Sequence, residues 1–175
     1  AAQQQPPRHL IYITKEPIFV HIYEPSDDED DAGQILWIGL EPQLTEEEEN
    51  IRRELVEVLL QEAPAAPNFT TDDEFEGILS QMIDRYTVLR QDLPVGPRRQ
   101  GRMWDILGLE DKRLAVDEAQ RQRLRYIIIR DLIRNGPLEP LLSDEMLEDI
   151  HSVGLKYIHM DHKVFGICLL YTSDA

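Results

Sequence analysis

The residues best suited to chemistry gather near the end of the sequence. His151, His159 and His162 stand close to Asp149 and Asp161, and imidazole and carboxylate groups bind metal ions or transfer protons. If this segment forms strands, His159 and Asp161 share one face and His162 points to the other. Because that geometry is poor for one metal ion, we expect ordinary strand and turn histidines. A histidine-bound metal enzyme is the competing interpretation.

A second segment, GPRRQGRM, superficially matches a phosphate-binding loop. Gly96 and Gly101 have the spacing of such a loop. The chemistry requires a lysine for the terminal phosphates and a serine or threonine for magnesium, whereas Arg102 and Met103 occupy those positions. We therefore predict a connecting loop with a basic cluster here.

Other catalytic patterns are absent from the sequence. It contains no G-x-S-x-G and no H-E-x-x-H, and its single cysteine, Cys168, excludes a disulfide framework. The adjacent Glu148 and Asp149 would lie on opposite faces of a strand, which does not suit an acid/base pair. The acid run Glu46 to Glu49 would spread around a helix as a solvated helix start. We predict no catalytic, cofactor-binding or metal-binding residue in this chain.

The charge is strongly asymmetric. Thirty-four acids and 18 bases give a net charge of −16, and residues 1–95 hold 21 of the acids but only 6 of the bases. Such a surface repels phosphate backbones, so we expect no nucleic-acid partner for this half. Only four of the bases are lysines, and abundant acids with few lysines suggest a cytosol of very high salt. An ordinary acidic domain is the alternative.

Composition and length favour a globular cytoplasmic protein. The chain has 175 residues, of which 42% are hydrophobic, enough for one core and a small second lobe. No apolar run approaches the roughly 18 residues of a membrane span, and no leader is evident. The first methionine is Met82, so we expect that the true start either lies upstream or was removed. The last eight residues, CLLYTSDA, resemble a translated sequencing adapter, and we expect them to lie outside the fold.

Hydrophobic periodicity divides the elements into strands and helices. Alternating apolar residues in 9–23, with a turn at 15–17, and the segment QILWIGLEP predict a small antiparallel sheet, separated by a solvated acidic loop at 26–33. Capping boxes at Thr45/Glu48 and Thr71/Glu74 begin two helices. A third helix runs from about Asp117 to Arg134, with Gly136 in its C-cap and arginines along its outer face. These arginines should face the acidic half or another subunit.

The expected fold is α+β, with a small antiparallel sheet, a three-helix bundle and a truncated final β-hairpin. We divide the chain into a lead-in (1–8), a strand and helix region (9–92), a loop-rich connector (93–116), a helix with the start of a second sheet (117–167) and the adapter-like segment (168–175). Between the third helix and that sheet, Pro137 and Pro140 should stiffen the chain. Leu138, Leu141 and Leu142 should anchor this corner on the helical bundle.

The stretch from Tyr126 to Gly166 resembles the N-terminal domain of the type II/type IV secretion ATPase superfamily. In that family a helix runs into a Gly-Pro-(Leu/Ile)-x-Pro-Leu-Leu-x-Asp turn and then a short strand ending in Asp-Ile. The matching residues here are Gly136, Pro137, Leu138, Pro140, Leu141, Leu142, Asp144, Glu148, Asp149, Ile150 and Gly154. Upstream, YITKEPIFVHIYEP and WIGLEPQLTEEE are similar to the archaeal branch, although Ile38 to Leu40 depart from its usual tyrosine-valine pair. EDIHSVGL with HKVFG is closest to the branch from salt-loving archaea.

This resemblance implies the N-terminal part of a hexameric cytoplasmic ATPase that assembles a type IV pilus-like filament or archaellum, or drives secretion. In the family the phosphate-binding loop lies in a C-terminal RecA-like domain, here expected well beyond Gly166. ATP and magnesium would therefore belong to the parent protein, and this part alone should be inactive. The resemblance also implies partners in the other hexamer subunits and a membrane platform protein, and a location at the inner face of the membrane.

Two other functions remain open at this point. A non-enzymatic acidic helical module would dock a basic partner through the first half of the chain. A conjugation-type DNA-transfer ATPase of the same superfamily would share this N-terminal domain.

Overall fold

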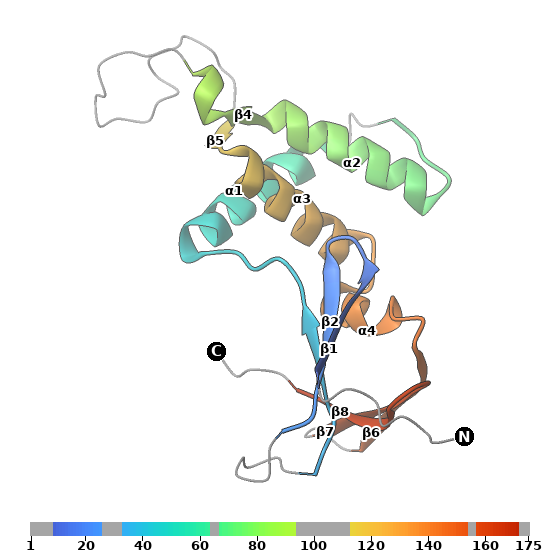
Figure 1. The fold of residues 1–175 in the computed structure, drawn as a ribbon. Helices are drawn as coiled ribbons and strands as arrows, with labels where there is room; N and C mark the ends of the chain where they lie inside the picture. Colours follow the sequence, from blue (N-terminus) through green and yellow to red (C-terminus); the bar gives the residue numbers. More distant parts are fainter. Residues whose placement is uncertain (1–8, 26–32, 64–66, 94–112, 154–156, 172–175) are drawn as a thin grey trace. The chain divides into compact units, whose positions relative to one another are not determined.

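A computed structural model describes residues 9–25, 33–63, 67–93, 113–153 and 157–171. The chain divides into two compact units (Figure 1). The sheet unit combines residues 1–42 with 137–175, and the helical unit contains residues 43–136. The lead-in, most of the acidic loop, the GPRRQGRM segment and residues 172–175 lie outside the described residues. The expected α+β class is confirmed, and residues 137–175 belong to the same unit as residues 1–42.

The sheet unit is built on a six-stranded sheet with the order β1-β2-β3-β8-β7-β6. Its strands are β1 (His9–Lys15), β2 (Ile18–Tyr23), β3 (Leu36–Leu40), β6 (Leu147–Val153), β7 (Tyr157–His162) and β8 (Gly166–Leu170). Neighbouring strands are antiparallel except for β3 and β8, which run parallel. The predicted small antiparallel sheet is confirmed by β1, β2 and β3. Its continuation through β8 was not predicted, because the parallel β3–β8 pair joins segments more than 120 residues apart, which local patterns do not reveal.

The final hairpin is complete, contrary to the prediction of a truncated one. After β7 the chain turns at residues 163–165, and β8 begins at Gly166, whose φ of +72° favours glycine. β8 then pairs with β7 from Gly166 to Leu169. Cys168 is fully buried opposite Met160. The expectation that residues 168–175 lie outside the fold is thus wrong for Cys168 to Leu170, which complete the sheet.

One face of the sheet carries the core of the sheet unit. Its buried members are Val20, Ile22, Trp37, Leu141, Met160 and Cys168. Alternation along β2 places Val20 and Ile22 on this face and Phe19 on the other. The prediction that these strands alternate is confirmed, and Trp37 of β3 lies in the same core.

The helical unit packs α1 (Glu46–Glu62), α2 (Asp72–Tyr86) and α3 (Glu118–Leu132) so that each helix contacts the other two (Figure 1). Leu55, Leu59, Leu79, Ile83, Ile128 and Ile129 form its buried core. A short parallel pair, β4 (Thr87–Leu89) with β5 (Leu114–Val116), and the 3₁₀ turn η2 (Arg90–Asp92) follow α2. The predicted three-helix bundle is confirmed, but β5 lies in the region expected to be loop.

Local capping explains where these helices begin. Thr45 and Glu48 form the predicted capping box, with the Glu48 N–H donating to Thr45 Oγ1 and the Thr45 N–H donating to Glu48 Oε2. Thr71 caps α2, but the Glu74 carboxylate accepts from the N–H and hydroxyl of Thr70 instead of closing the box on Thr71. Asp117 caps α3 and exchanges hydrogen bonds with Gln120.

A fourth short helix was not predicted. After α3 the chain passes through the 3₁₀ turn η4 (Gly136–Leu138) into α4 (Glu139–Leu142) and then β6. Gly136 has a φ of +56°, which confirms its left-handed conformation. We call residues 136–144 the corner segment.

Candidate functional site

Asp144, at the end of the corner segment, is the centre of a buried hydrogen-bond network. Its Oδ2 accepts from the Tyr12 hydroxyl at 2.5 Å and from Trp37 Nε1 at 2.9 Å. Its Oδ1 accepts from the backbone N–H of Met146 at 2.9 Å. The side chain thus joins β1, β3 and the start of β6, with only 5% of the residue exposed.

His162 extends this network. Its Nδ1 accepts backbone N–H groups from Val164 at 3.1 Å and Phe165 at 3.3 Å, so the ring proton must sit on Nε2. Nε2 then donates to the Tyr12 hydroxyl oxygen at 3.2 Å, while the hydroxyl donates to Asp144. The result is a directional chain from His162 through Tyr12 to Asp144.

The electrostatics keep this chain in one protonation state. Burial lowers the pKa of His162, the Asp144 charge opposes that effect, and Lys163 adds to it, so the ring is neutral at pH 7. Burial first, and then the hydrogen bond to Asp144, raise the pKa of Tyr12 far above its usual value. His162 bonds to Tyr12, and Tyr12 and Trp37 both donate to the Asp144 side chain. We call this structural clamp the Asp144 network.

The corner segment contributes to the core of the sheet unit. Leu141 is 5% exposed within the sheet core, whereas Leu138 and Leu142 are 52% and 58% exposed. The prediction that all three leucines anchor the corner on the bundle is therefore wrong. A Cβ added at Gly39 would lie 3.2 Å from Pro140 Cβ, so glycine there permits the close approach of α4 to β3.

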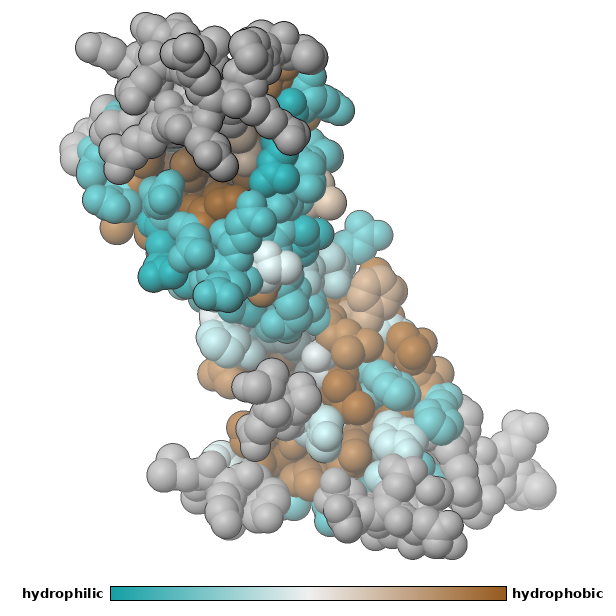
Figure 2. Space-filling view, turned by 90° about the vertical axis from the view of Figure 1, so that its left-hand side faces the viewer, coloured by the Kyte–Doolittle hydropathy of each residue, from teal (hydrophilic) through white to brown (hydrophobic). Residues whose placement is uncertain are grey.

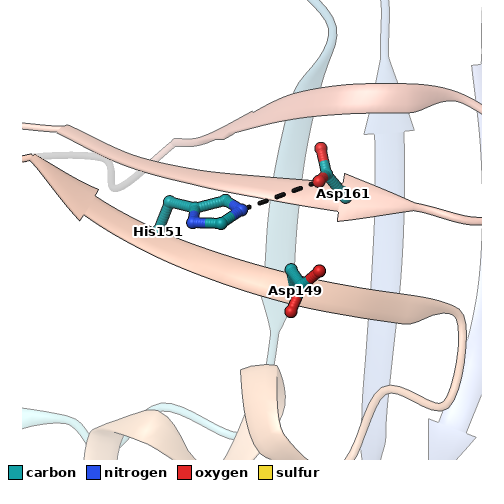
Figure 3. A group of neighbouring side chains, drawn as sticks. All are labelled: Asp149, His151 and Asp161. Atoms are coloured by element: carbon teal, nitrogen blue, oxygen red, sulfur yellow. Dashed lines mark ion pairs between the residues drawn. The ribbon is translucent and has the colours of Figure 1, made fainter.

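The exposed cluster at β6 and β7 contains Asp149, His151 and Asp161 (Figure 3). Asp149 and His151 lie two residues apart on β6 and so share a face, and Asp161 is the direct partner of Asp149 on β7. One ligand atom from each residue lies within 4.8 Å of the others, and His151 Nε2 is 3.6 Å from Asp161 Oδ2. We call these three residues the Asp-His cluster.

Sequence reasoning named these residues but did not bring them together. The expectation that His159 and Asp161 share a face, with His162 opposite, is confirmed, since His162 is buried in the Asp144 network and the Asp161 side chain is partly exposed. The missing information was the register, in which Asp149 pairs with Asp161 and His151 with His159. The mirrored order D-x-H in β6 and H-x-D in β7 was the available signal.

The arginines of α3 face acids within the helical unit. Arg123 pairs with Glu48 of α1, and Arg121 and Arg125 both pair with Asp84 of α2. Arg134, just after the helix, pairs with Glu76 at 2.8 Å, and Arg130 pairs with its neighbour Asp131. The prediction that these arginines meet the acidic half is confirmed for all of them except Arg130.

The acid run at the start of α1 is only partly solvated as predicted. Glu46, Glu47 and Glu49 are not buried, but Glu48 is 1% exposed and bound by Arg123 and Thr45. Cys168 is buried, and burial, with smaller effects from Asp144 and Asp161, raises its thiol pKa to about 11. Among the described residues, no helix has the length and apolar character needed to cross a membrane.

Comparison with known proteins identifies archaeal relatives. The chain is 31% identical over 160 residues, 91% of its length, to the uncharacterized protein MJ0900 of Methanocaldococcus jannaschii, and it covers 27% of that relative. It is 35% identical over 57 residues, 32% of its length, to the uncharacterized protein MJ1288 of the same organism, of which it covers 23%. The chain therefore spans about a quarter of the length of each relative. No model of a known protein family matches it.

Proposed function

We propose that this chain is the N-terminal part of a hexameric ATPase that powers assembly of a type IV pilus-like filament or archaellum, or protein secretion. The observation that carries the proposal is the corner segment. Its sequence resembles the corresponding turn of the secretion ATPase superfamily, and residues 137–144 pack within the sheet unit just before β6. Asp144, which closes the motif, is fixed by Tyr12, Trp37 and the Met146 N–H.

A fixed connection suits a protein that transmits force. The chain passes from α3 to β6 through η4 and α4 without a long loop. Pro140 is buried against β3, and Glu139, 5% exposed, lies 4.0 Å from Lys15 at the end of β1. Since each of these contacts restrains the corner segment, strain applied to β6 would reach α4 with little loss by bending.

The relatives support a longer parent protein. Nearly three quarters of MJ0900 lies outside its match to this chain, which leaves room for a separate nucleotide-binding domain. In our proposal that domain holds the phosphate-binding loop, ATP and magnesium. The sheet and helical units described above would then be a positioning and coupling module without catalytic residues of its own.

The sheet unit also offers a surface for the proposed partners. Ile13, Phe19 and Leu40 are direct cross-strand neighbours on β1, β2 and β3, and each is more than 40% exposed. Ile11 extends this row at 62% exposure. Figure 2 shows apolar side chains gathered on the sheet unit, whereas the helical unit is mostly hydrophilic in the same view. Exposed apolar rows of this kind commonly mark interfaces, and neighbouring subunits or a membrane platform protein are the partners we propose.

The test is to recover the natural gene and compare three proteins. We expect its reading frame to encode G-x-x-x-x-G-K-[ST] after a strand downstream of Gly166. The full-length protein should hydrolyse ATP, a variant with that lysine changed to alanine should lose most of the activity, and the 175-residue chain should have none. A full-length protein with no such motif, or with ATP turnover unchanged in the lysine variant, would contradict the proposal. Neighbouring pilin genes would support filament assembly, and a neighbouring relaxase gene would favour DNA transfer.

A further inference from the structure

The Asp-His cluster has the composition of a transition-metal site. One imidazole nitrogen and two carboxylate oxygens converge from adjacent strands (Figure 3). Zn²⁺ accepts both donor types, whereas Mg²⁺ and Ca²⁺ prefer oxygen alone. Two carboxylates would also balance the charge of a divalent ion. The donor set therefore favours Zn²⁺ or a closely related ion over the hard cations.

The pairing of the two aspartates is electrostatically unfavourable without a cation. Asp149 and Asp161 are direct cross-strand partners, and like charges in that position destabilise a sheet. In the described part of the chain, the one ion pair made by either carboxylate is the 3.6 Å contact of Asp161 with His151. No described lysine or arginine pairs with either aspartate. A bound divalent ion would remove this repulsion.

The geometry allows the donors to close on an ion. Zn²⁺ bonds to nitrogen and oxygen measure about 2.0–2.2 Å, which places tetrahedral donors roughly 3.4 Å apart. The present separations, up to 4.8 Å, exceed this by little more than 1 Å. Because the His151 and Asp161 side chains are 58% and 42% exposed, rotation about their side-chain bonds can close the gap without moving the strands.

We propose that Asp149, His151 and Asp161 bind one Zn²⁺ ion on the exposed surface of the β6–β7 hairpin, with water completing the coordination. The site belongs to the sheet unit and uses no residue of the Asp144 network. The evidence for this site is the register of the two strands and the charge of their side chains, and it does not depend on the proposed ATPase function. Zinc would tie the edge strand β6 to β7 by side-chain bonds in addition to their backbone ladder.

The experiment is calorimetric titration of the metal-free chain with Zn²⁺ alone. We expect one Zn²⁺ per chain, and His151→Ala and Asp161→Asn should each weaken binding by at least about tenfold. The matched control is the double variant His9→Ala, His21→Ala, since His9 and His21 are stacked histidines on the distant β1–β2 hairpin with ring centroids 5.7 Å apart. The control should retain the affinity of the original chain.

A second readout separates site binding from general attraction to an acidic protein. Zn²⁺ should raise the melting temperature of the original chain and of the control, but not of His151→Ala, because a ligand of the native state stabilises it by mass action. Circular dichroism confirms that each variant is folded, which we expect for exposed positions. The proposal is overturned if no Zn²⁺ binds, if both cluster variants bind as tightly as the original chain, or if binding is lost in the control.

Discussion

The Asp144 network predicts that Asp144→Ala destabilises the sheet unit strongly. The substitution leaves Trp37 Nε1, the Tyr12 hydroxyl and the Met146 N–H without their acceptor. A buried donor left unpaired costs about 1–3 kcal/mol, and Tyr12 can recover part of this by bonding to water because it is only partly buried. We therefore expect a loss of about 4 kcal/mol in the free energy of unfolding, a large fraction of the stability of an ordinary domain.

The assay is urea unfolding followed by tryptophan fluorescence. The chain has two tryptophans, so a Trp104→Phe background leaves Trp37, in the sheet core, as the one reporter. Tyr12→Phe is the partner variant for a double-mutant cycle. Because Tyr12 bridges His162 and Asp144, its effect after Asp144→Ala should be smaller than its effect alone, with a coupling of about 1–2 kcal/mol.

The matched control for this prediction is Glu145→Ala. Glu145 is the exposed neighbour of Asp144, and a surface substitution should change stability by no more than about 0.5 kcal/mol. If Asp144→Ala shifted the urea midpoint no more than this control, or if the effects of Tyr12→Phe and Asp144→Ala simply added, the Asp144 network would not be the clamp described above.

Three further predictions concern other positions. Glu48→Gln should destabilise the helical unit by about 2 kcal/mol at pH 7. Burial raises the Glu48 pKa, but the bonds from Arg123 and Thr45 outweigh burial and leave the pKa below its usual value, so the stabilisation is present above the unfolded-state pKa and fades as pH falls through the folded-state pKa. Thermal melts at several pH values that show no such fading would contradict this prediction. Gly136→Ala should lower the free energy of unfolding by about 1 kcal/mol, because Gly136 has a positive φ. Gly77→Ala should raise it by a similar amount, because Gly77 lies inside α2 with open space where a Cβ would stand. Urea unfolding of the two variants should therefore show changes of opposite sign in the free energy of unfolding. At pH 7 the Cys168 thiol should react with a thiol reagent at least about a hundredfold more slowly in the folded chain than in the urea-unfolded chain, because burial raises its pKa to about 11. Equal reaction rates would refute its burial.

Local chemistry made the helices predictable. A cap residue and an acid or amide three positions later are sufficient to locate a helix start, and Thr45, Thr71 and Asp117 all cap helices in the structure. The pattern could not show that Glu48 would be buried against Arg123, because that contact joins residues 75 positions apart. The sequence therefore predicts the ends of helices better than the roles of the residues at those ends.

The candidate site was less predictable because it depends on strand register. Asp149, His151 and Asp161 were all recognised as capable of chemistry, yet a metal ion needs donors from both strands, and which residues face each other is set by the hairpin between them. The same limit applies to Asp144, whose partners on β1 and β3 lie 132 and 107 residues away. A single sequence carries no direct signal for contacts at that separation.

The corner segment shows what its sequence motif does physically. Gly136 supplies the left-handed turn out of α3, Pro140 fits against Gly39, Leu141 fills the sheet core and Asp144 binds Trp37. Each of these residues is therefore accounted for by packing or hydrogen bonding. A motif built this way marks an architecture that a motor can share with proteins of other function. Consequently, ATP hydrolysis by the full-length protein, and not further matches within the motif, decides between the proposed motor and its alternatives.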